Sequence, residues 1–284
     1  MKNTVKKILA VVLAGIMVVS LASCSVGDKV RDYFNEETTV TEPRTNKSEK
    51  PNDQLKTIEY FNTISANLKK SNPYNIILNR EFSTNDFESE NANLKAMFPT
   101  VSKFIINNST FIDKEINGRT ALEEGKISNI AHVYPIEASM QASNVLLKQV
   151  KLATTAQTTD YYIITIDFTD DATPFEAGGL GEVFNVNDKA AILEELKGAS
   201  DMFVIKDYTA EYNGGRIVCT VDRTTDQIIS TTYTRVIKIT AEVTGQGEFA
   251  DIKNETVTFN LTENEHYEIE WSEGDLEKRN QDKD

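Results

Sequence analysis

Apolar and polar residues alternate along much of the C-terminal half of the chain, a pattern typical of β-strands that bury one face. The longest alternating run covers residues 228–243, where every second position from Ile229 to Val243 is largely apolar and the positions between are largely polar. A straight strand of this length would exceed about 50 Å at ~3.4 Å per residue. We therefore expect this strand to bend strongly or to contain a bulge.

Shorter runs of the same kind predict further strands. They cover residues 74–82, 149–156, 161–168, 182–186, 202–211, 216–222, 257–261 and 267–271. Asn213-Gly214 is a strong signal for a tight hairpin turn, so we expect residues 216–222 to run back along residues 202–211. Thr262 to Glu265 are polar and are interpreted as the link between the last two strands.

Two segments have apolar residues at helical spacing. The first follows Asn52 and Asp53, either of which can cap a helix, and its apolar positions are Leu55, Ile58, Phe61, Ile64 and Leu68. The second covers residues 188–197 and ends at Gly198. The pattern is least regular between residues 85 and 147, where it predicts one or two short helices broken at Pro99.

One-sided antiparallel strands must cover their apolar face, and the two helical segments are the candidates for this role. The predicted fold class is therefore α+β: a curved antiparallel sheet, a half-barrel-like meander, packed against an N-terminal helix and a second short helix. We expect a single domain over residues 52–271. The last residues, 272–284, are strongly charged and are expected to form a disordered tail.

The N-terminus has a different pattern. Three lysines (Lys2, Lys6 and Lys7) precede an apolar run over residues 8–21, and Leu21-Ala22-Ser23-Cys24 follows at its end. This is the layout of a secretory signal peptide, and the run is shorter than the ~18 residues that a transmembrane helix needs. The four residues resemble the processing motif of bacterial lipoproteins. That resemblance implies that residues 1–23 are removed and that the Cys24 thiol carries a diacylglycerol with acyl chains such as palmitate.

Residues 24–51 are mainly polar and charged, and we interpret them as a lipidated flexible tether. The expected location is therefore the extracytoplasmic face of the cell membrane, with the membrane contacted through the N-terminal lipid. Removal of residues 1–23 takes away three lysines and no acid, which changes the formal net charge from −14 to −17. Such an acidic surface repels phosphate backbones, so nucleic acid is not an expected partner.

No motif for catalysis, metal binding or cofactor binding is recognisable in the sequence. His132 and His266 are far apart and match no zinc-binding spacing, and the glycine-rich residues 177–182 lack the lysine of a P-loop. Cys219 alternates with apolar residues and is expected to be buried and inert. Carboxylates near residues 167–171 are interpreted as solvated turn residues. We therefore expect no metal, no cofactor and no enzymatic activity.

A first helix that leads directly into a strand, together with a long meander at the end of the chain, resembles LolA-type and mycobacterial LprG-type lipid-carrying lipoproteins. The hairpin Val221-Asp222-Arg223-Thr224-Thr225-Asp226-Gln227-Ile228-Ile229 is similar to a turn in such folds and in uncharacterised lipoproteins of low-GC Gram-positive bacteria. This resemblance covers the order of elements over residues 53–271 and contains no specific motif. Fold resemblance by itself does not establish function.

Two functional hypotheses follow from this interpretation. In the first, the concave face of the sheet binds a lipid or another apolar ligand. Its candidate lining residues are Tyr233, Ile237, Val257, Phe259 and Trp271. In the second, the helices fill this face completely, and the protein is a surface-tethered structural or protein-interaction module with no small-molecule ligand. A cavity of a few hundred Å³ favours the first hypothesis, and a packed interior favours the second.

Overall fold

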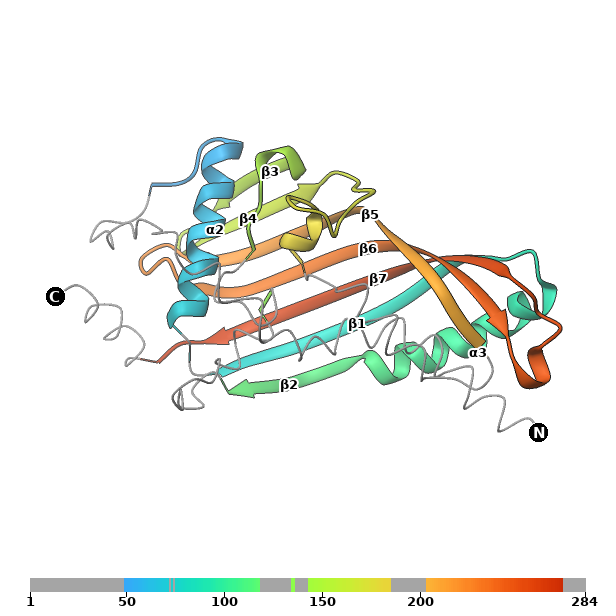
Figure 1. Cartoon of the computed structure of the whole chain (residues 1–284). Coiled ribbons are helices and arrows are strands. Elements are labelled where there is room, and N and C mark those ends of the chain that lie inside the picture. Colours follow the sequence, from blue (N-terminus) through green and yellow to red (C-terminus); the bar gives the residue numbers. More distant parts are fainter. Residues whose placement is uncertain are drawn as a thin grey trace, which may run out of the picture.

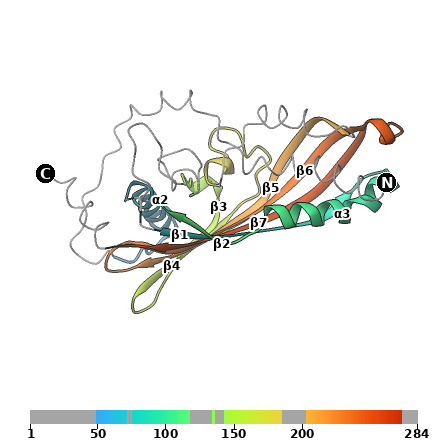
Figure 2. The same ribbon diagram turned by 90° about the horizontal axis from the view of Figure 1, so that it is seen from below.

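In a computed structural model of the chain, the described residues are 49–71, 73, 75–117, 134–135, 143–184 and 203–272. Their strands form an open seven-stranded antiparallel sheet with the order β2-β1-β7-β6-β5-β4-β3 (Figure 1). The strands are β1 Asn75–Glu88, β2 Phe111–Asn117, β3 Val150–Gln157, β4 Tyr161–Phe168, β5 Phe203–Asp222, β6 Ile228–Gly245 and β7 Glu255–Glu270. The sheet is curved, as Figure 2 shows. The predicted α+β class is confirmed.

The N-terminal helix α2, Gln54–Ser71, crosses the core face at one end of the sheet (Figure 1). Its cap is Asp53, whose Oδ1 accepts the backbone N–H of Lys56 at 2.8 Å. The helix buries four of its five predicted apolar positions against the sheet, whereas Leu55 in its first turn is 49% exposed. The four buried positions are Ile58, Phe61, Ile64 and Leu68. Tyr60 also packs edge-on against Tyr162 of β4, with ring centroids 6.2 Å apart. The helix predicted from apolar spacing is thus confirmed.

A second helix, α3, covers the other end of the same face. It spans Ala92–Ser109 and continues through Pro99, so the predicted break at this proline is wrong. Proline removes the N–H that would bond the carbonyl of Lys95, and both residues are exposed, so water can serve that carbonyl. The ring of Phe98 on α3 packs against the ring of Phe259 on β7, with ring centroids 5.7 Å apart.

Strand β5 replaces the hairpin that we expected at Asn213-Gly214. Both halves of β5 pair with β6, and the register shifts between Tyr212 and Gly215. The two intervening residues therefore form an irregularity within one long strand, with Gly214 at φ +74°. The prediction was wrong because β6 is long enough to pair with residues on both sides of Asn213-Gly214, and such pairing cannot be read from a local turn signal.

Strand β6 keeps one register with β7 along its length, while its pairing with β5 shifts at three places. One of these shifts leaves Ile229 of β6 without an opposite residue, which places a bulge near the start of the strand. The bulge predicted from the length of this strand is therefore present. The other two shifts insert extra residues in β5 rather than in β6.

Strand β7 is continuous, so the predicted link at Thr262 to Glu265 is also wrong. All four of these residues pair with β1 on one side and β6 on the other. Glu263 and Glu265 point to the same buried face as Phe259 and Tyr267, and all four of these side chains are at most 6% exposed. The two glutamates are therefore buried strand residues, although their polarity alone predicts a loop.

Other predictions fall partly or wholly beyond the described residues. Residues 180–182 form the short 3₁₀-helix η3, Leu180–Glu182, instead of the start of the strand predicted at 182–186. The expected helix at 188–197 lies outside the described residues, as do the signal peptide, Cys24, most of the tether and the tail from residue 273. Neither helix in the described part is long and apolar enough to cross a bilayer.

Candidate functional site

Four charged side chains lie in the middle of the apolar face of the sheet. They are Arg80 of β1, Arg235 of β6, and Glu263 and Glu265 of β7, with exposed fractions of 5%, 4%, 1% and 6%. We call these four residues the charge cluster. The strand registers bring them together, because Arg80 pairs directly with Glu265 and Arg235 pairs directly with Glu263. Side chains opposite each other on neighbouring antiparallel strands are close enough to interact.

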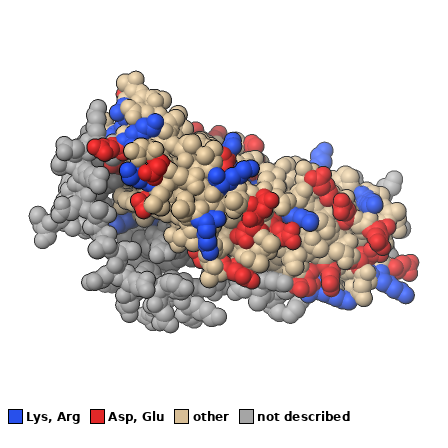
Figure 3. Space-filling model, turned by 90° about the horizontal axis from the view of Figure 1, so that it is seen from above, with Lys and Arg blue, Asp and Glu red and all other residues tan. Residues whose placement is uncertain are grey.

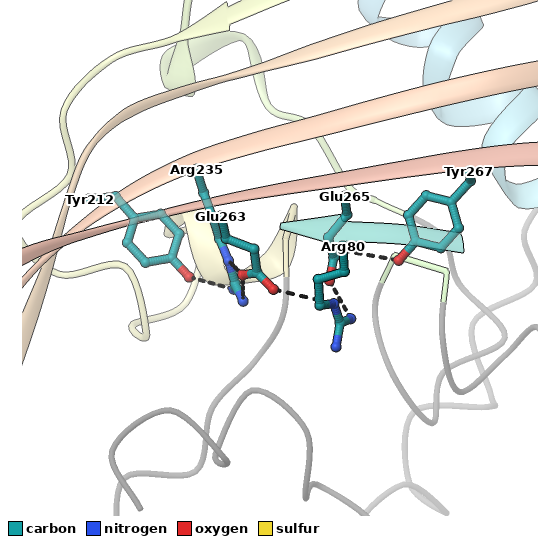
Figure 4. Close-up of polar contacts among 6 residues, drawn as sticks. All are labelled: Arg80, Tyr212, Arg235, Glu263, Glu265 and Tyr267. Atoms are coloured by element: carbon teal, nitrogen blue, oxygen red, sulfur yellow. Dashed lines mark hydrogen bonds and ion pairs between the residues drawn. The ribbon is translucent and has the colours of Figure 1, made fainter. Parts of the chain in front are cut away.

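The charge cluster is an unbroken chain of alternating charge (Figure 4). Arg235 contacts Glu263 Oε2 through both Nε and Nη2. On the other side of Glu263, Oε1 lies 3.4 Å from Arg80 Nε, and Arg80 Nη2 contacts Glu265 Oε1. A tyrosine closes each end: Arg235 Nη1 donates to the Tyr212 hydroxyl at 3.4 Å, and the Tyr267 hydroxyl donates to Glu265 Oε2 at 3.0 Å.

The two arginines remain positively charged in this setting. Burial acts to lower the pKa of Arg80 and of Arg235, but the facing carboxylates outweigh burial and raise both. The facing carboxylates therefore keep both guanidinium groups ionised. Such pairs hold buried charges in place without necessarily adding stability over apolar residues of the same size.

The pKa values of the two glutamates are shifted in opposite directions. Burial raises the pKa of Glu263 to about 7, with Glu265 contributing in the same direction and Arg235 and Arg80 opposing. The pKa of Glu265 is lowered despite burial, because Arg80 and Arg235 favour its charged form and Tyr267 donates a hydrogen bond to it. The two carboxylates titrate as a pair, and Glu263 is the one nearest to protonation at neutral pH.

Aromatic rings surround the charge cluster. Tyr134 packs edge-on against Tyr233 and Tyr267, with ring centroids 5.7 and 5.0 Å apart, and Phe184 packs against Tyr212 at 5.8 Å. Burial raises the pKa of the tyrosine hydroxyls, so they stay neutral donors. These rings separate the charges from solvent and keep the local dielectric constant low.

A small cavity adjoins the charge cluster. Its lining residues are Pro135, Phe184, Tyr233, Arg235, Glu263 and Glu265. Its volume is about 10 Å³, close to the ~10–15 Å³ that one water molecule requires. Pockets for small-molecule ligands usually measure about 300–1,000 Å³. The cavity therefore suits a water molecule and is far too small for an acyl chain.

The five residues predicted to line a ligand site are all turned to the core side. Tyr233, Ile237, Val257 and Phe259 are at most 6% exposed, and Trp271 is partly buried against the same core. Only Tyr233 borders the cavity. Phe259 packs under α3, whereas the indole N–H of Trp271 donates to the Ile228 carbonyl at 2.8 Å, beyond the other end of β7. Twelve positions of extended chain separate these two residues, about 40 Å at ~3.4 Å per residue.

Four residues that could take part in binding or proton transfer are not evident from the sequence alone: Arg80, Arg235, Glu263 and Glu265. A signal for them exists in the alternation. Arg235 occupies a position in the apolar register of residues 229–243, and the two glutamates continue the register of Val257 to Leu261 towards Tyr267. Opposite charges in the buried registers of neighbouring strands indicate a buried ion pair, provided that the strand order is known.

The remaining candidates have structural roles. Cys219 is fully buried, burial raises its pKa to about 12, and its Sγ accepts the Thr231 hydroxyl at 3.4 Å. Asp171 accepts the backbone N–H groups of Thr173 and Leu180 at 2.9 and 2.7 Å, which fixes the glycine-rich loop. His266 lies on the opposite face of the sheet, 2.8 Å from the Thr232 hydroxyl. Among the described residues there is no group of His, Cys, Asp and Glu suited to a metal ion.

Neither a scan against protein-family models nor a search of curated proteins found a match for this chain. Function is therefore inferred from the residues and from the geometry of the sheet. In the described part of the chain, that geometry is a packed core face with paired charges at its centre.

Proposed function

We propose that the protein is a membrane-anchored, extracytoplasmic lipoprotein whose folded part is a surface-tethered structural or protein-interaction module. The anchor is supported by the lysines, the short apolar run and the motif Leu21-Ala22-Ser23-Cys24. A module of this kind, rather than a lipid carrier, is supported by one observation. The charge cluster crosses the centre of the face on which an apolar ligand would lie.

An acyl chain on this face would meet two obstacles. The side chains proposed to line its site are already buried by other protein atoms, and Phe259 has no exposed surface. At the centre of the face lie paired guanidinium and carboxylate groups, and each of their polar atoms that an acyl chain separated from its partner would cost about 1–3 kcal/mol. Both obstacles favour a face that stays closed.

The opposite face of the sheet is where a partner would find access. The described helices both pack on the core face, so neither covers this outer face. Its central residues are polar, among them Thr234 of β6, which binds Asn264 of β7 at 2.7 Å, and Thr240, which lies 3.2 Å from Thr258. Figure 3 looks from the side of β3 rather than onto this face, and in that view acidic and basic side chains are interspersed over the described surface. A non-obligate interface is about as polar as the rest of a protein surface, so the polarity of this face is compatible with partner binding.

The proposal is tested by measuring lipid binding and partner binding on the same protein. Native mass spectrometry of the purified full chain should show the covalent N-terminal lipid and no additional lipid. Oleic acid or phospholipid vesicles should leave the Trp271 emission and the melting temperature unchanged. A saturable emission change together with a higher melting temperature would indicate a ligand that binds the folded state, which is the lipid-carrier hypothesis.

Partner binding is tested with a photo-crosslinking amino acid at Asn264 on the outer face, and with a matched control at exposed Thr169 at the end of β4. Illumination of intact cells should yield a discrete crosslinked product from position 264 and none from position 169. If position 264 gives no product under conditions in which the protein is surface-exposed, the interaction module is rejected.

A further inference from the structure

Two carboxylate oxygens of the charge cluster are buried without a hydrogen-bond donor among the described residues. Glu263 Oε1 and Glu265 Oε1 are fully shielded from solvent, and neither accepts a hydrogen bond of good geometry among the described residues. Both make ion-pair contacts with Arg80 from the side of β1. Both glutamates also line the cavity of about 10 Å³, and Arg235 contributes to the same lining. Buried carboxylate oxygens ordinarily accept several hydrogen bonds.

We propose that this cavity is a binding site for a single water molecule, held between the Glu263 and Glu265 carboxylates, and that Glu263 is the proton-accepting group of the core face. A water molecule donates two hydrogen bonds, which matches the two carboxylates in the lining, and it can accept one from the Arg235 guanidinium. Buried waters typically make about three hydrogen bonds to protein groups that are otherwise unsatisfied. Pro135 and Phe184 form apolar walls that restrict the site to one molecule.

The charged and titratable groups around Glu263 come from four strands. They are Arg80 from β1, Arg235 and Tyr233 from β6, Tyr212 from β5, and Glu265 with Tyr267 from β7. With two guanidinium groups and two carboxylates the charge cluster is neutral, and one added proton gives it a charge of +1. Of the two glutamates, Glu263 is the more deeply buried and has a pKa of about 7. The water molecule would lie next to the Glu263 carboxyl and could pass a proton to it.

Infrared spectroscopy tests proton uptake directly, because a protonated carboxyl absorbs at higher frequency than a carboxylate. The full chain is titrated in detergent between pH 8 and pH 6, a range in which exposed carboxyls with pKa values near 4 stay ionised. We expect one protonated-carboxyl band with a midpoint near pH 7, absent from Glu263→Gln. It should persist in the control Glu268→Gln, which changes an exposed residue of the same strand.

Two results would overturn the proton-accepting role: no band in the wild-type protein down to pH 6, or a band that survives in Glu263→Gln. The wild-type titration decides even if the variant does not fold, which far-UV circular dichroism would reveal. A crystal structure of the full chain that resolves ordered water tests the binding site itself. Density for one water within ~3.2 Å of both carboxylates supports the site, whereas a cavity closed by side chains refutes it.

Discussion

Replacing Arg235 by Met tests whether the charge cluster holds the core together as the geometry implies. The substitution keeps a side chain of similar length but removes the cation that contacts Glu263 through two nitrogens. Glu263 then keeps only the weaker contact with Arg80, at 3.4 Å, while Glu265 still repels its charge. The Tyr212 hydroxyl also loses the hydrogen bond from Arg235. We expect the variant to fold with a lower free energy of unfolding.

The expected loss is about 3 kcal/mol at pH 8. Two unit charges 4 Å apart attract by about 4 kcal/mol at an effective dielectric constant of 20, and removal of one partner of a buried pair typically costs about 3–5 kcal/mol. We expect the lower end of this range of about 3–5 kcal/mol, because Glu263 can take up a proton and so avoid being a buried charge without a partner. Its folded pKa of about 7 lies above the value of 4.5 for a free glutamate, so folding favours the protonated form between these values. The wild-type protein therefore loses stability from this group as the pH rises towards 7.

Arg235 lowers the pKa of Glu263 in the wild-type protein, so its removal raises that pKa further and a larger fraction of the variant carries a neutral carboxyl at each pH between 6 and 8. The wild-type protein is already largely protonated at this position at pH 6. The attraction lost on substitution is therefore smaller there, and the difference in stability should shrink as the pH falls from 8 to 6. Urea unfolding of the unlipidated chain, followed by Trp271 emission, measures both values.

Arg216→Met is the matched control. Arg216 is an exposed arginine of β5 that pairs with Asp167 at 2.5 Å on the outer face, and exposed pairs contribute about 0–1 kcal/mol. Replacing all four members of the charge cluster by Met and Leu should restore most of the stability, because no buried charge then lacks a partner. A loss below about 1 kcal/mol for Arg235→Met, or a loss that grows as the pH falls, would refute the reasoning.

Three further predictions follow from other parts of the molecule. Phe259→Ala should lower the free energy of unfolding by about 3–5 kcal/mol, because the ring is fully buried under α3, whereas Leu55→Ala, at a half-exposed position, should cost far less in the same urea titration. Cys219 should react with a thiol-specific chromogenic reagent only at the rate of unfolding, because burial raises its pKa to about 12; rapid labelling under native conditions would contradict its buried position. Cys24→Ala should abolish lipidation and membrane retention, measured by cell fractionation, while the far-UV circular dichroism of the folded part stays unchanged; a cleaved variant that remains in the membrane fraction would argue against the lipid anchor.

The parts of the fold that the sequence predicts well are those in which one local pattern decides the structure. The helix at Gln54–Ser71 and the buried face of β6 from Thr231 onwards follow directly from the spacing of apolar residues. The hairpin predicted at Asn213-Gly214 was wrong because pairing with β6 outweighs the local turn preference of these two residues. That pairing is known only once the arrangement of strands in the sheet is known. The predicted break at Pro99 was wrong because this proline lies on the exposed side of α3, where water can bond the carbonyl of Lys95.

The charge cluster was missed for a related reason. Glu263 and Glu265 look like loop residues when they are read alone, since a buried acidic residue is stable only with a partner. Their partners Arg80 and Arg235 lie on two other strands. The alternation along β7 indicates on which face of the sheet each side chain lies. The strand order β1-β7-β6 is also needed to know which residues of the neighbouring strands lie opposite each side chain.

The pairing of β1 with β7 has a consequence for the order in which the chain can fold. Arg80 and Glu265 are neighbours in the sheet but 185 residues apart in the sequence, and contacts of such long range form late because a large loop must close first. As the chain is synthesised, β1 can pair with β2, but its other edge waits for β7, the last strand of the sheet. The sheet can therefore be completed only after almost the whole chain has emerged, which would suit the extracytoplasmic location proposed above, because a chain exported before it folds would complete the sheet on the far side of the membrane.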